Sequence, residues 1–432
     1  MQTLFPQVMQ TLFPKVLDVI VAFLLLSGGF CFALMAKGAF VLRHLARENP
    51  REDGVSLLKS RLAPSVSVIA APQDAGAESR ALVRLLVGLQ FGNHEVVLVL
   101  NAPSDADFAA WSEEFHLELS LRQVSGPLPM GAVRSVLESR DPIRLTAIVL
   151  DPCSRGQALN AAVNAAQCPV IGLFGASSEF DSESLLRLIR PMLEDPLRTI
   201  AVCGVAPAPT GTSLVSQFAA LDFLRAWLSR QSALSGWNLL TPAPGSAVLV
   251  CRDSIVKLGG FRAGALELVL RLHADARASK RAYRVAFVPG SGCLQRRPRS
   301  LAELRAEIVR DGQGVARAVF TAGALPWWLR CGMFSVRFVR PLLETAAYLL
   351  TLAGLAAGWI HWPLALLVLL STAGMGMLLS MAAVSLRELA EYRGSDPARL
   401  ARLFFASIPE NVGFRQLRNL WLLALWGKRA DW

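Results

Sequence analysis

The sequence predicts an α/β domain held between membrane-spanning helices. Residues 19–36 carry no charge, and residues 345–386 contain no Lys, Arg, Asp or Glu, so both stretches are long enough to cross a bilayer. Between them, short apolar runs alternate with amphipathic stretches, which is the pattern of βαβ units. The 432-residue chain is 53% hydrophobic and has a positive mean hydropathy, so it is more apolar than an ordinary soluble protein.

The charges around the apolar runs predict their topology. Residues 17–37 form one transmembrane helix, and no small-residue cleavage site follows it, which favours an anchor over a signal peptide. Residues 341–386 form two more helices, joined by a Trp-containing turn at 359–363. Arginines flank the pair on both sides, and the basic residues after the first helix are Lys37, Arg43, Arg47 and Arg51. By the positive-inside rule the main domain of this multi-pass membrane protein is expected in the cytoplasm.

Three further segments border these helices. Residues 1–8 and 9–16 are near-identical octapeptides, which fit either a local duplication or two alternative starts. Residues 324–340 mix aromatics with arginine, as helices in the headgroup plane do, and residues 397–432 form a second amphipathic segment of this kind. A third span is the alternative for the latter, although the charges of Glu410, Arg415 and Arg418 would be costly in hydrocarbon.

The composition excludes several functional classes. The net charge of +11 suits an anionic lipid surface, and no basic run is interleaved with aromatics as a nucleic-acid groove requires. Membrane lipid is therefore an expected partner, and nucleic acid is not. The seven cysteines are scattered without a Cys-x-x-Cys pair, which predicts buried thiols in a reducing compartment and neither a zinc site nor a disulfide framework.

The α/β domain is expected over residues 64–320. Strands are predicted at 65–71, 96–100, 147–150, 170–174, 200–205, 246–250 and 285–288, and helices at 78–89, 157–166 and 182–193. A strand, helix and strand at this spacing imply a parallel sheet that binds its ligand at the carboxyl ends of the strands.

Several ordered motifs resemble the membrane-bound family-two glycosyltransferases. Residues 64–68 look like the family's opening strand, Arg155-Gly-Gln-Ala-Leu-Asn160 is similar to its basic helix start, and Gly259-Gly-Phe-Arg262 is similar to its acceptor region. Residues 181–196 resemble the helix after the metal turn, and residues 410–416 a tail segment of one bacterial branch. The resemblance implies a GT-A-like nucleotide-diphospho-sugar transferase fold with a cytoplasmic active site.

The family's metal site is altered in this sequence. In the family, the strand at 170–174 ends in Asp-x-Asp, whose carboxylates hold the divalent cation beside the sugar-nucleotide diphosphate. Here the matching residues are Gly175, Ala176 and Ser177. The resemblance therefore implies a divalent cofactor whose ligands are missing, and no cofactor is expected.

Four other positions have also lost the family's chemistry. The Asp pair that receives the nucleotide matches Leu100 and Asn101, and the turn of the acceptor base matches residues 263–265 around Gly264. Arg296 replaces an acidic residue, and of the Gln-x-x-Arg-Trp signature only Arg310 remains. No catalytic residue is expected. The predicted degenerate pocket comprises Asn101, Arg155, Asn160, Gly175, Ser177, Gly264, Arg296 and Arg310.

Nearby acids have ordinary explanations. Asp181 is predicted to be the N-cap of the following helix and Glu179 a solvated turn residue. Glu267 is expected to form a surface ion pair with Arg271 at i+4, and His273 is expected to be a structural helix residue.

Three hypotheses of function follow. The favoured one is an inactive glycosyltransferase-like partner in bacterial surface or exopolysaccharide biosynthesis or export, beside an active glycosyltransferase or an export protein. A second is a live glycosyltransferase that uses Glu179 or Glu267 as a displaced base. The third is a sensor or scaffold that binds a nucleotide or nucleotide-sugar without metal through the arginines, which could instead face anionic lipid.

Overall fold

The computed structural model describes residues 4–48, 63–72, 76–141, 144–174, 178–204, 211, 213–225, 229–242, 245–289, 291, 293–295, 298–321, 327–390 and 397–427. The chain divides into two compact units. The helical unit comprises Met1–Ala46, Pro209–Gly236 and Arg297–Trp432, and the α/β unit comprises Arg47–Ala208 and Trp237–Arg296. Residues 209–236 and 297–320, which the sequence places in the α/β domain, thus belong to the helical unit.

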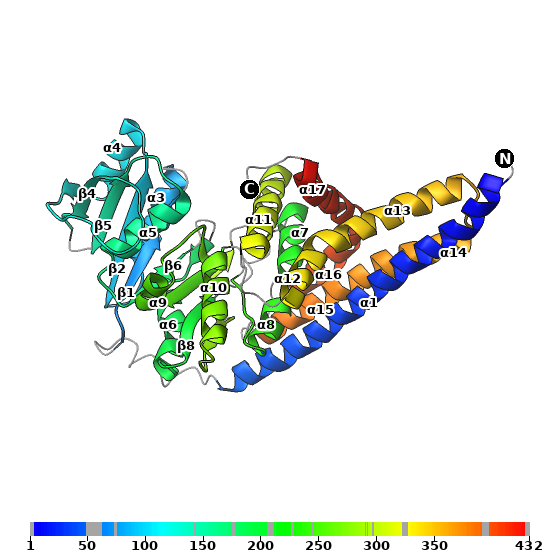
Figure 1. The fold of residues 1–432 in the computed structure, drawn as a ribbon, viewed down its shortest axis with the longest axis horizontal. Coiled ribbons are helices and arrows are strands. Elements are labelled where there is room, and N and C mark those ends of the chain that lie inside the picture. The colour runs from blue at the N-terminus through cyan, green and yellow to red at the C-terminus, as the bar shows by residue number, and fades with distance from the viewer. Residues whose placement is uncertain are drawn as a thin grey trace. The chain divides into compact units, whose positions relative to one another are not determined.

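The α/β unit is built on a nine-stranded sheet with the order β10-β8-β9-β6-β1-β2-β5-β4-β3 (Figure 1). Its strands are β1 (Val66–Ala70), β2 (His94–Asn101), β3 (Leu117–Leu119), β4 (Val133–Ser139), β5 (Leu145–Leu150), β6 (Val170–Leu173), β8 (Thr199–Gly204), β9 (Ala247–Cys251) and β10 (Arg284–Val288). A separate antiparallel pair joins β7 (Ser178–Phe180) to β11 (Cys293–Gln295). The predicted α/β class is confirmed.

The centre of the sheet is the parallel set that the sequence predicts. β1 pairs in parallel with both β2 and β6, and β2 pairs in parallel with β5. β1, β5 and β6 are buried along their whole length. Strands covered on both faces need mostly apolar side chains, which is why each reads as a nearly continuous apolar run, interrupted only by Ser67 in β1 and Thr146 in β5.

The sheet as a whole is mixed, and in this the expectation of a parallel sheet was wrong. β9 lies between β6 and β8 and runs antiparallel to both, and β4 runs antiparallel to β5 and β3. An apolar run gives no information on strand direction, which depends on the connections. β3 and β4 were also missed because both mix exposed and buried residues.

Helices connect the strands of the α/β unit. They are α3 (Ala77–Val87), α4 (Asp105–Glu114), α5 (Arg155–Ala165), α6 (Ser184–Glu194), α9 (Arg252–Lys257) and α10 (Ala265–Ala278). The predicted N-cap at Asp181 was wrong, because Glu183 is the N-cap of α6 and makes no capping hydrogen bond through its side chain. Asp181 instead forms an ion pair with Arg187, with 3.0 Å between Oδ2 and Nη1.

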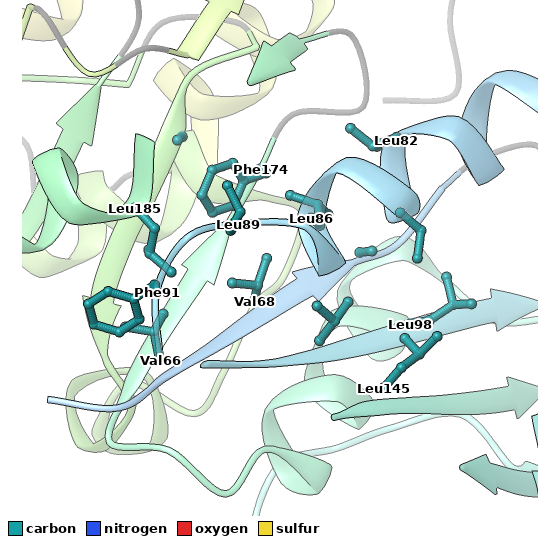
Figure 2. Packing of buried hydrophobic residues seen from close by; sticks show 14 of the residues in the cluster. Val66, Val68, Leu82, Leu86, Leu89, Phe91, Leu98, Leu145, Phe174 and Leu185 are labelled. Atoms are coloured by element: carbon teal, nitrogen blue, oxygen red, sulfur yellow. The ribbon is translucent and has the colours of Figure 1, made fainter. Parts of the chain in front are cut away.

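The main core lies between α3, α6 and the central strands. Val68 of β1, Leu86 of α3 and Leu185 of α6 belong to one buried cluster (Figure 2). Leu100 and Phe174, which follow the apolar parts of β2 and β6, belong to the same cluster, and the ring of Phe174 packs edge-on against Phe180 at 4.7 Å between centroids. Both residues therefore serve the packing of the core.

The helical unit contains the long apolar helices. Its elements are α1 (Leu4–Glu48), α7 (Leu214–Phe223), α8 (Ser229–Ser235), α11 (Leu301–Thr321), α12 (Trp327–Phe334), α13 (Arg340–Ala356), α14 (Trp362–Leu369), α15 (Met375–Ala390), α16 (Pro397–Pro409) and α17 (Arg415–Gly427). Single π-helical turns join some of them: η2 (Ser335–Val339), η3 (Leu370–Gly374) and η4 (Glu410–Phe414). Leu17, Ile20 and Leu24 of α1 pack against Ala347 and Val368 of the α13–α14 pair.

Within the described ranges, three helical stretches are long and apolar enough to cross a membrane: Leu12–His44, Arg330–Ala356 and Trp362–Leu386. The first covers the predicted helix at 17–37, and the other two cover the predicted pair at 341–386. The second also takes in residues 330–340, which the sequence assigns to a separate interfacial helix. Gly358, with φ of +70°, ends the second stretch before the turn at Trp359, because glycine adopts this left-handed conformation without strain.

The C-terminal segment is a bent pair of helices. α16 and α17 are separated at Val412 and Gly413, where the backbone leaves helical geometry and the φ of Gly413 is +131°. Phe414 and Leu422 pack with Leu304 and Ile308 of α11. Among the described residues, this segment is not one of the stretches long and apolar enough to span; its place at the membrane surface remains a prediction.

Candidate functional site

The candidate site is the edge of the sheet where four parallel strands end. β6, β1, β2 and β5 are neighbours in this order, and all four run in the same direction. Their carboxyl ends lead into Phe174, Ala71, Asn101 and Asp151. Ligands of open α/β sheets bind at such an edge, so the residues that follow these strands define what the edge can do.

Asn101 ties the end of β2 to the loop after β5. Its Nδ2 donates a hydrogen bond to the backbone oxygen of Cys153 at 2.9 Å, and its Oδ1 accepts one from the backbone nitrogen of Cys153 at 3.1 Å. An amide has both a donor and an acceptor, so it matches both backbone groups at once. The side chain at the end of β2 therefore holds a loop of the protein itself.

Replacing Asn101 with aspartate should not rebuild a nucleotide site. The carboxylate would place an acceptor against the Cys153 carbonyl oxygen, where Asn101 Nδ2 now donates. Because the site is exposed, we expect a loss of about 1 kcal/mol, measured as a lower Tm. Asn101→Ala is the matched control, since it loses both bonds without adding repulsion and should be the more stable variant. An Asn101→Asp protein as stable as wild type would contradict this role of the amide.

The loop held by Asn101 leads directly into α5. Ser154 and Gln157 form a capping box, in which each side chain meets the backbone nitrogen of the other residue. Arg155 is the first residue of the helix and is exposed. Gly156 faces the backbone of Arg262, whose oxygen would lie 2.6 Å from a Cβ at this position. Because glycine has only a hydrogen atom at this position, α5 can approach the turn at residues 259–262 closely.

Asn160, on α5, holds the turn at residues 259–261 through its side-chain amide. Its Oδ1 accepts a hydrogen bond from the Phe261 nitrogen at 2.7 Å, and its Nδ2 donates to the oxygens of Phe261 at 3.2 Å and Pro129 at 2.9 Å. Only 1% of Asn160 is exposed. Gly260 has φ of +83°, and a Cβ there would collide with Asn160. Asn160 is therefore a buried positioning residue for the turn at 259–261.

Glu267 and Arg271 hold the same turn from the side of α10. Arg271 donates from Nη1 to the oxygen of Gly260 at 2.7 Å and forms an ion pair with Glu267 at 3.1 Å. Oε2 of Glu267 accepts a hydrogen bond from the Arg262 nitrogen at 3.3 Å. The predicted pair is present, but the prediction of a surface position was wrong, because Glu267 is only 5% exposed. Gly264, the N-cap of α10, has an extended backbone.

Two further ionisable groups of the α/β unit, Asp151 and His273, are also engaged. Asp151 pairs with Arg134 at 3.0 Å. Burial lowers the pKa of His273 to about 4, although the Leu240 carbonyl opposes this shift. Its Nε2 lies 2.7 Å from that carbonyl oxygen and its Nδ1 3.0 Å from the Tyr283 hydroxyl oxygen. His273 is thus a neutral residue within the packing at physiological pH.

Four predicted pocket residues are not part of the described α/β unit. Arg310 lies on α11 of the helical unit. Gly175, Ser177 and Arg296 lie outside the described residues. The structure thus brings together Asn101, Arg155, Asn160 and Gly264 through the 151–155 loop and the 259–264 turn. Sequence reasoning missed Cys153 as the partner of Asn101, Phe261 as the partner of Asn160, and the bond from Arg271 to Gly260; the Gly259-Gly260 pair was the one signal of a turn that needs support.

A divalent cation does not fit the donors at the metal turn. Gly175, Ala176 and Ser177 supply no carboxylate, which is the ligand that Mg²⁺ and Mn²⁺ favour. Within the described part of the chain, no group of three His, Cys, Asp or Glu residues is placed to hold a metal ion. No chemical step at this edge is therefore derived through a metal.

No family profile matches the sequence, and no curated protein matches it. Among solved structures, the mannosyltransferase PcManGT from Pyrobaculum calidifontis, in complex with GDP-Man and Mn²⁺, is 17% identical with a TM-score of 0.49, over 95% of this chain and 98% of that one. Glucosyl-3-phosphoglycerate synthase from Mycobacterium tuberculosis is 15% identical with a TM-score of 0.38, over 64% and 86%. TarS from S. aureus, in complex with UDP-GlcNAc, is 11% identical with a TM-score of 0.39, over 82% and 92%.

Proposed function

We propose that this chain is a membrane-anchored, GT-A-like member of the family-two glycosyltransferases that lacks transferase activity. Its role would be that of a partner in bacterial surface or exopolysaccharide biosynthesis or export. The observation that carries the proposal is the use of Asn101: both ends of its amide hold Cys153. The position where the family receives a nucleotide is thus occupied by an internal contact.

The losses along the site act on different parts of the reaction. The Gly175-Ala176-Ser177 turn removes the carboxylates beside the diphosphate, and the 263–265 segment has no general base. Positioned acid–base groups contribute roughly 10²–10⁴ in rate, and a metal contributes several kcal/mol of charge stabilisation. Losing both removes leaving-group stabilisation together with activation of the nucleophile, so transfer at a useful rate is not expected.

The competing proposal is a live transferase with a displaced base. Glu267 is poorly suited to this role, because its carboxylate is buried and engaged by Arg271 and the Arg262 nitrogen. Glu179 has its backbone paired with Leu294 in the β7–β11 pair. A base must reach the acceptor hydroxyl within hydrogen-bonding distance, which Glu267 could do only by giving up contacts that hold the turn.

The expected setting follows from the helices. Three apolar stretches favour membrane anchoring, and we propose the bacterial inner membrane with the α/β unit in the cytoplasm. An active glycosyltransferase or a polysaccharide export protein is the proposed protein partner, and membrane lipid the other contact. A nucleotide or nucleotide-sugar, bound without metal beside Arg155, is the ligand of the sensor alternative.

Binding and turnover of nucleotide-sugars test the proposal. Full-length protein in detergent is titrated with UDP, UDP-sugars and GDP-mannose, with and without Mn²⁺, and sugar release is followed in the same samples. We expect no turnover and no dependence of binding on Mn²⁺. Metal-dependent binding with turnover would overturn the proposal in favour of the enzyme. Metal-independent binding that Arg155→Ala weakens would instead identify a sensor. Arg402→Ala, at an exposed position on α16, is the matched control.

A further inference from the structure

The helical unit contains a buried group of charged side chains, called here the charge cluster. It joins α7, α11, α13, α17, η2 and η4. Its members are Asp222, Arg225, Asp311, Arg337, Arg340, Glu344, Glu410, Arg415 and Arg418. Glu410 is fully buried, and Glu344 and Arg415 are 3% and 5% exposed. Charges removed from water to this degree require compensation by opposite charge.

Three carboxylates of the cluster are matched by three arginines. Glu410 pairs with Arg225 at 2.8 Å, and Glu344 pairs with Arg415 at 2.8 Å. Asp222 lies 3.3 Å from Arg225 and 3.2 Å from Arg418. Burial would raise the pKa of Asp222, but the guanidinium groups of Arg418, Arg225 and Arg337 outweigh burial and lower it. Each of these three acids is therefore paired with arginine.

Among the described residues, neither Arg337 nor Arg340 forms an ion pair with a carboxylate, although Arg337 lies within electrostatic reach of Asp222 and Asp311. Arg337 is 7% exposed; its Nη2 donates to the backbone oxygen of Ile308 at 3.2 Å, and its Nε has no partner. Arg340 places Nη1 3.3 Å from the Cys31 sulfur, and its Nε also lacks a partner. Arg340 lies within electrostatic reach of Arg415 and Arg225, which carry the same charge, and of Glu344, whose carboxylate is paired with Arg415.

The remaining acid does not balance these two cations at neutral pH. Asp311 has its pKa raised to about 8, chiefly by burial, with Arg337 opposing the shift and Glu307 adding to it. Glu307 and Arg310 lie beside it on α11 with opposite charges. Five guanidinium groups thus face three carboxylates that are paired with arginine, and the cluster carries an excess of positive charge.

We propose that the charge cluster binds the phosphate of an anionic lipid headgroup through Arg337 and Arg340. Both residues lie near the start of the candidate span Arg330–Ala356, and lipid phosphates lie at the ends of membrane spans. Arginine forks match phosphate oxygens in geometry and charge. The lipid would supply the negative charge that the protein lacks and would join α12, η2 and α13 to the headgroup layer.

The test compares thermal unfolding of full-length protein in nanodiscs of phosphatidylcholine with unfolding in nanodiscs that also contain phosphatidylglycerol. We expect the anionic lipid to raise the Tm of the wild type by about 3 °C. Arg337→Gln combined with Arg340→Gln should lose this response. Its Tm in phosphatidylcholine should be no lower than that of the wild type, because the variant removes unpaired buried charge. Arg402→Gln, on the exposed side of α16, should respond as the wild type does.

Three outcomes would overturn the proposal. The first is an equal response of the double variant and the wild type to phosphatidylglycerol. The second is a double variant that is less stable than the wild type in phosphatidylcholine, which would show that both arginines act as internal hydrogen-bond donors; the single variant Arg340→Gln separates the two contributions. The third is the same Tm shift on adding inorganic phosphate to phosphatidylcholine nanodiscs, which would assign the site to a soluble anion.

Discussion

Replacing Arg415 with methionine should lower the free energy of unfolding by about 3–5 kcal/mol, the usual cost of removing one partner from a buried ion pair. Arg415 joins Glu344 through Nε at 2.8 Å and through Nη2 at 2.9 Å, and it donates to Asn411 Oδ1 at 2.9 Å. Without it, the Glu344 carboxylate stays buried and unpaired. Thermal unfolding in phosphatidylcholine nanodiscs measures the change.

The double variant Glu344→Leu/Arg415→Met distinguishes the net contribution of the ion pair from the cost of leaving Glu344 buried without a partner. Replacing a buried pair with apolar side chains is often neutral, so the double variant should recover most of the loss. Arg402→Met is the exposed control. If the single variant kept the wild-type Tm, then Glu344 would have another partner or would be protonated. Arg337→Gln should not lower the Tm as Arg415→Met does, since it removes a charge that has no ion-pair partner in the same cluster.

Replacing Asn160 with alanine should destabilise the α/β unit by about 3 kcal/mol. Three hydrogen bonds are lost, to the nitrogen and oxygen of Phe261 and the oxygen of Pro129, and a buried polar group left without a partner costs about 1–3 kcal/mol. Part of the loss is recovered where the 259–261 turn can open to water. Urea unfolding of the full chain reports the global change.

A local measurement distinguishes this role of Asn160 from general damage. Amide hydrogen exchange should rise first at residues 258–262, because this turn loses one of its two supports while Arg271 still holds Gly260 and Leu258. Glu113→Ala, at an exposed position on α4, is the control. Uniform exchange across the sheet in Asn160→Ala, with no local rise, would contradict the positioning role.

Much of the fold could be predicted because its central strands are buried on both faces. The runs that end at Leu100, Leu150 and Phe174 are apolar at every position and so identify β2, β5 and β6 directly. The direction of β9 could not be predicted, because the apolar run at 246–250 would read the same in either direction. The three-residue strands β3, β7 and β11 are too short to give a pattern.

The site could be predicted in its positions but not in its contacts. Asn101 and Asn160 were identified from motifs, yet their partners Cys153 and Phe261 lie 52 and 101 residues further along the chain. Glu267 was expected at the surface because i,i+4 ion pairs usually lie on exposed helix faces. It is instead buried, and its carboxylate accepts a hydrogen bond from the backbone nitrogen of Arg262. Contacts between residues so far apart in the chain depend on how α5, α10 and the turn pack together, which no local sequence pattern encodes.

The length of α1, which begins within the first octapeptide, has a consequence for its place in a membrane. A helix of 45 residues is about 68 Å long, more than twice the thickness of a hydrocarbon core of about 30 Å. On α1, Phe13 contacts Trp359, and Leu17 and Ile20 pack against α13 and α14. These three residues of α1 all come after residue 8. A helix of this length that crosses a bilayer extends beyond the hydrocarbon core at one end or at both, so part of α1 must lie in the headgroup layer or in water.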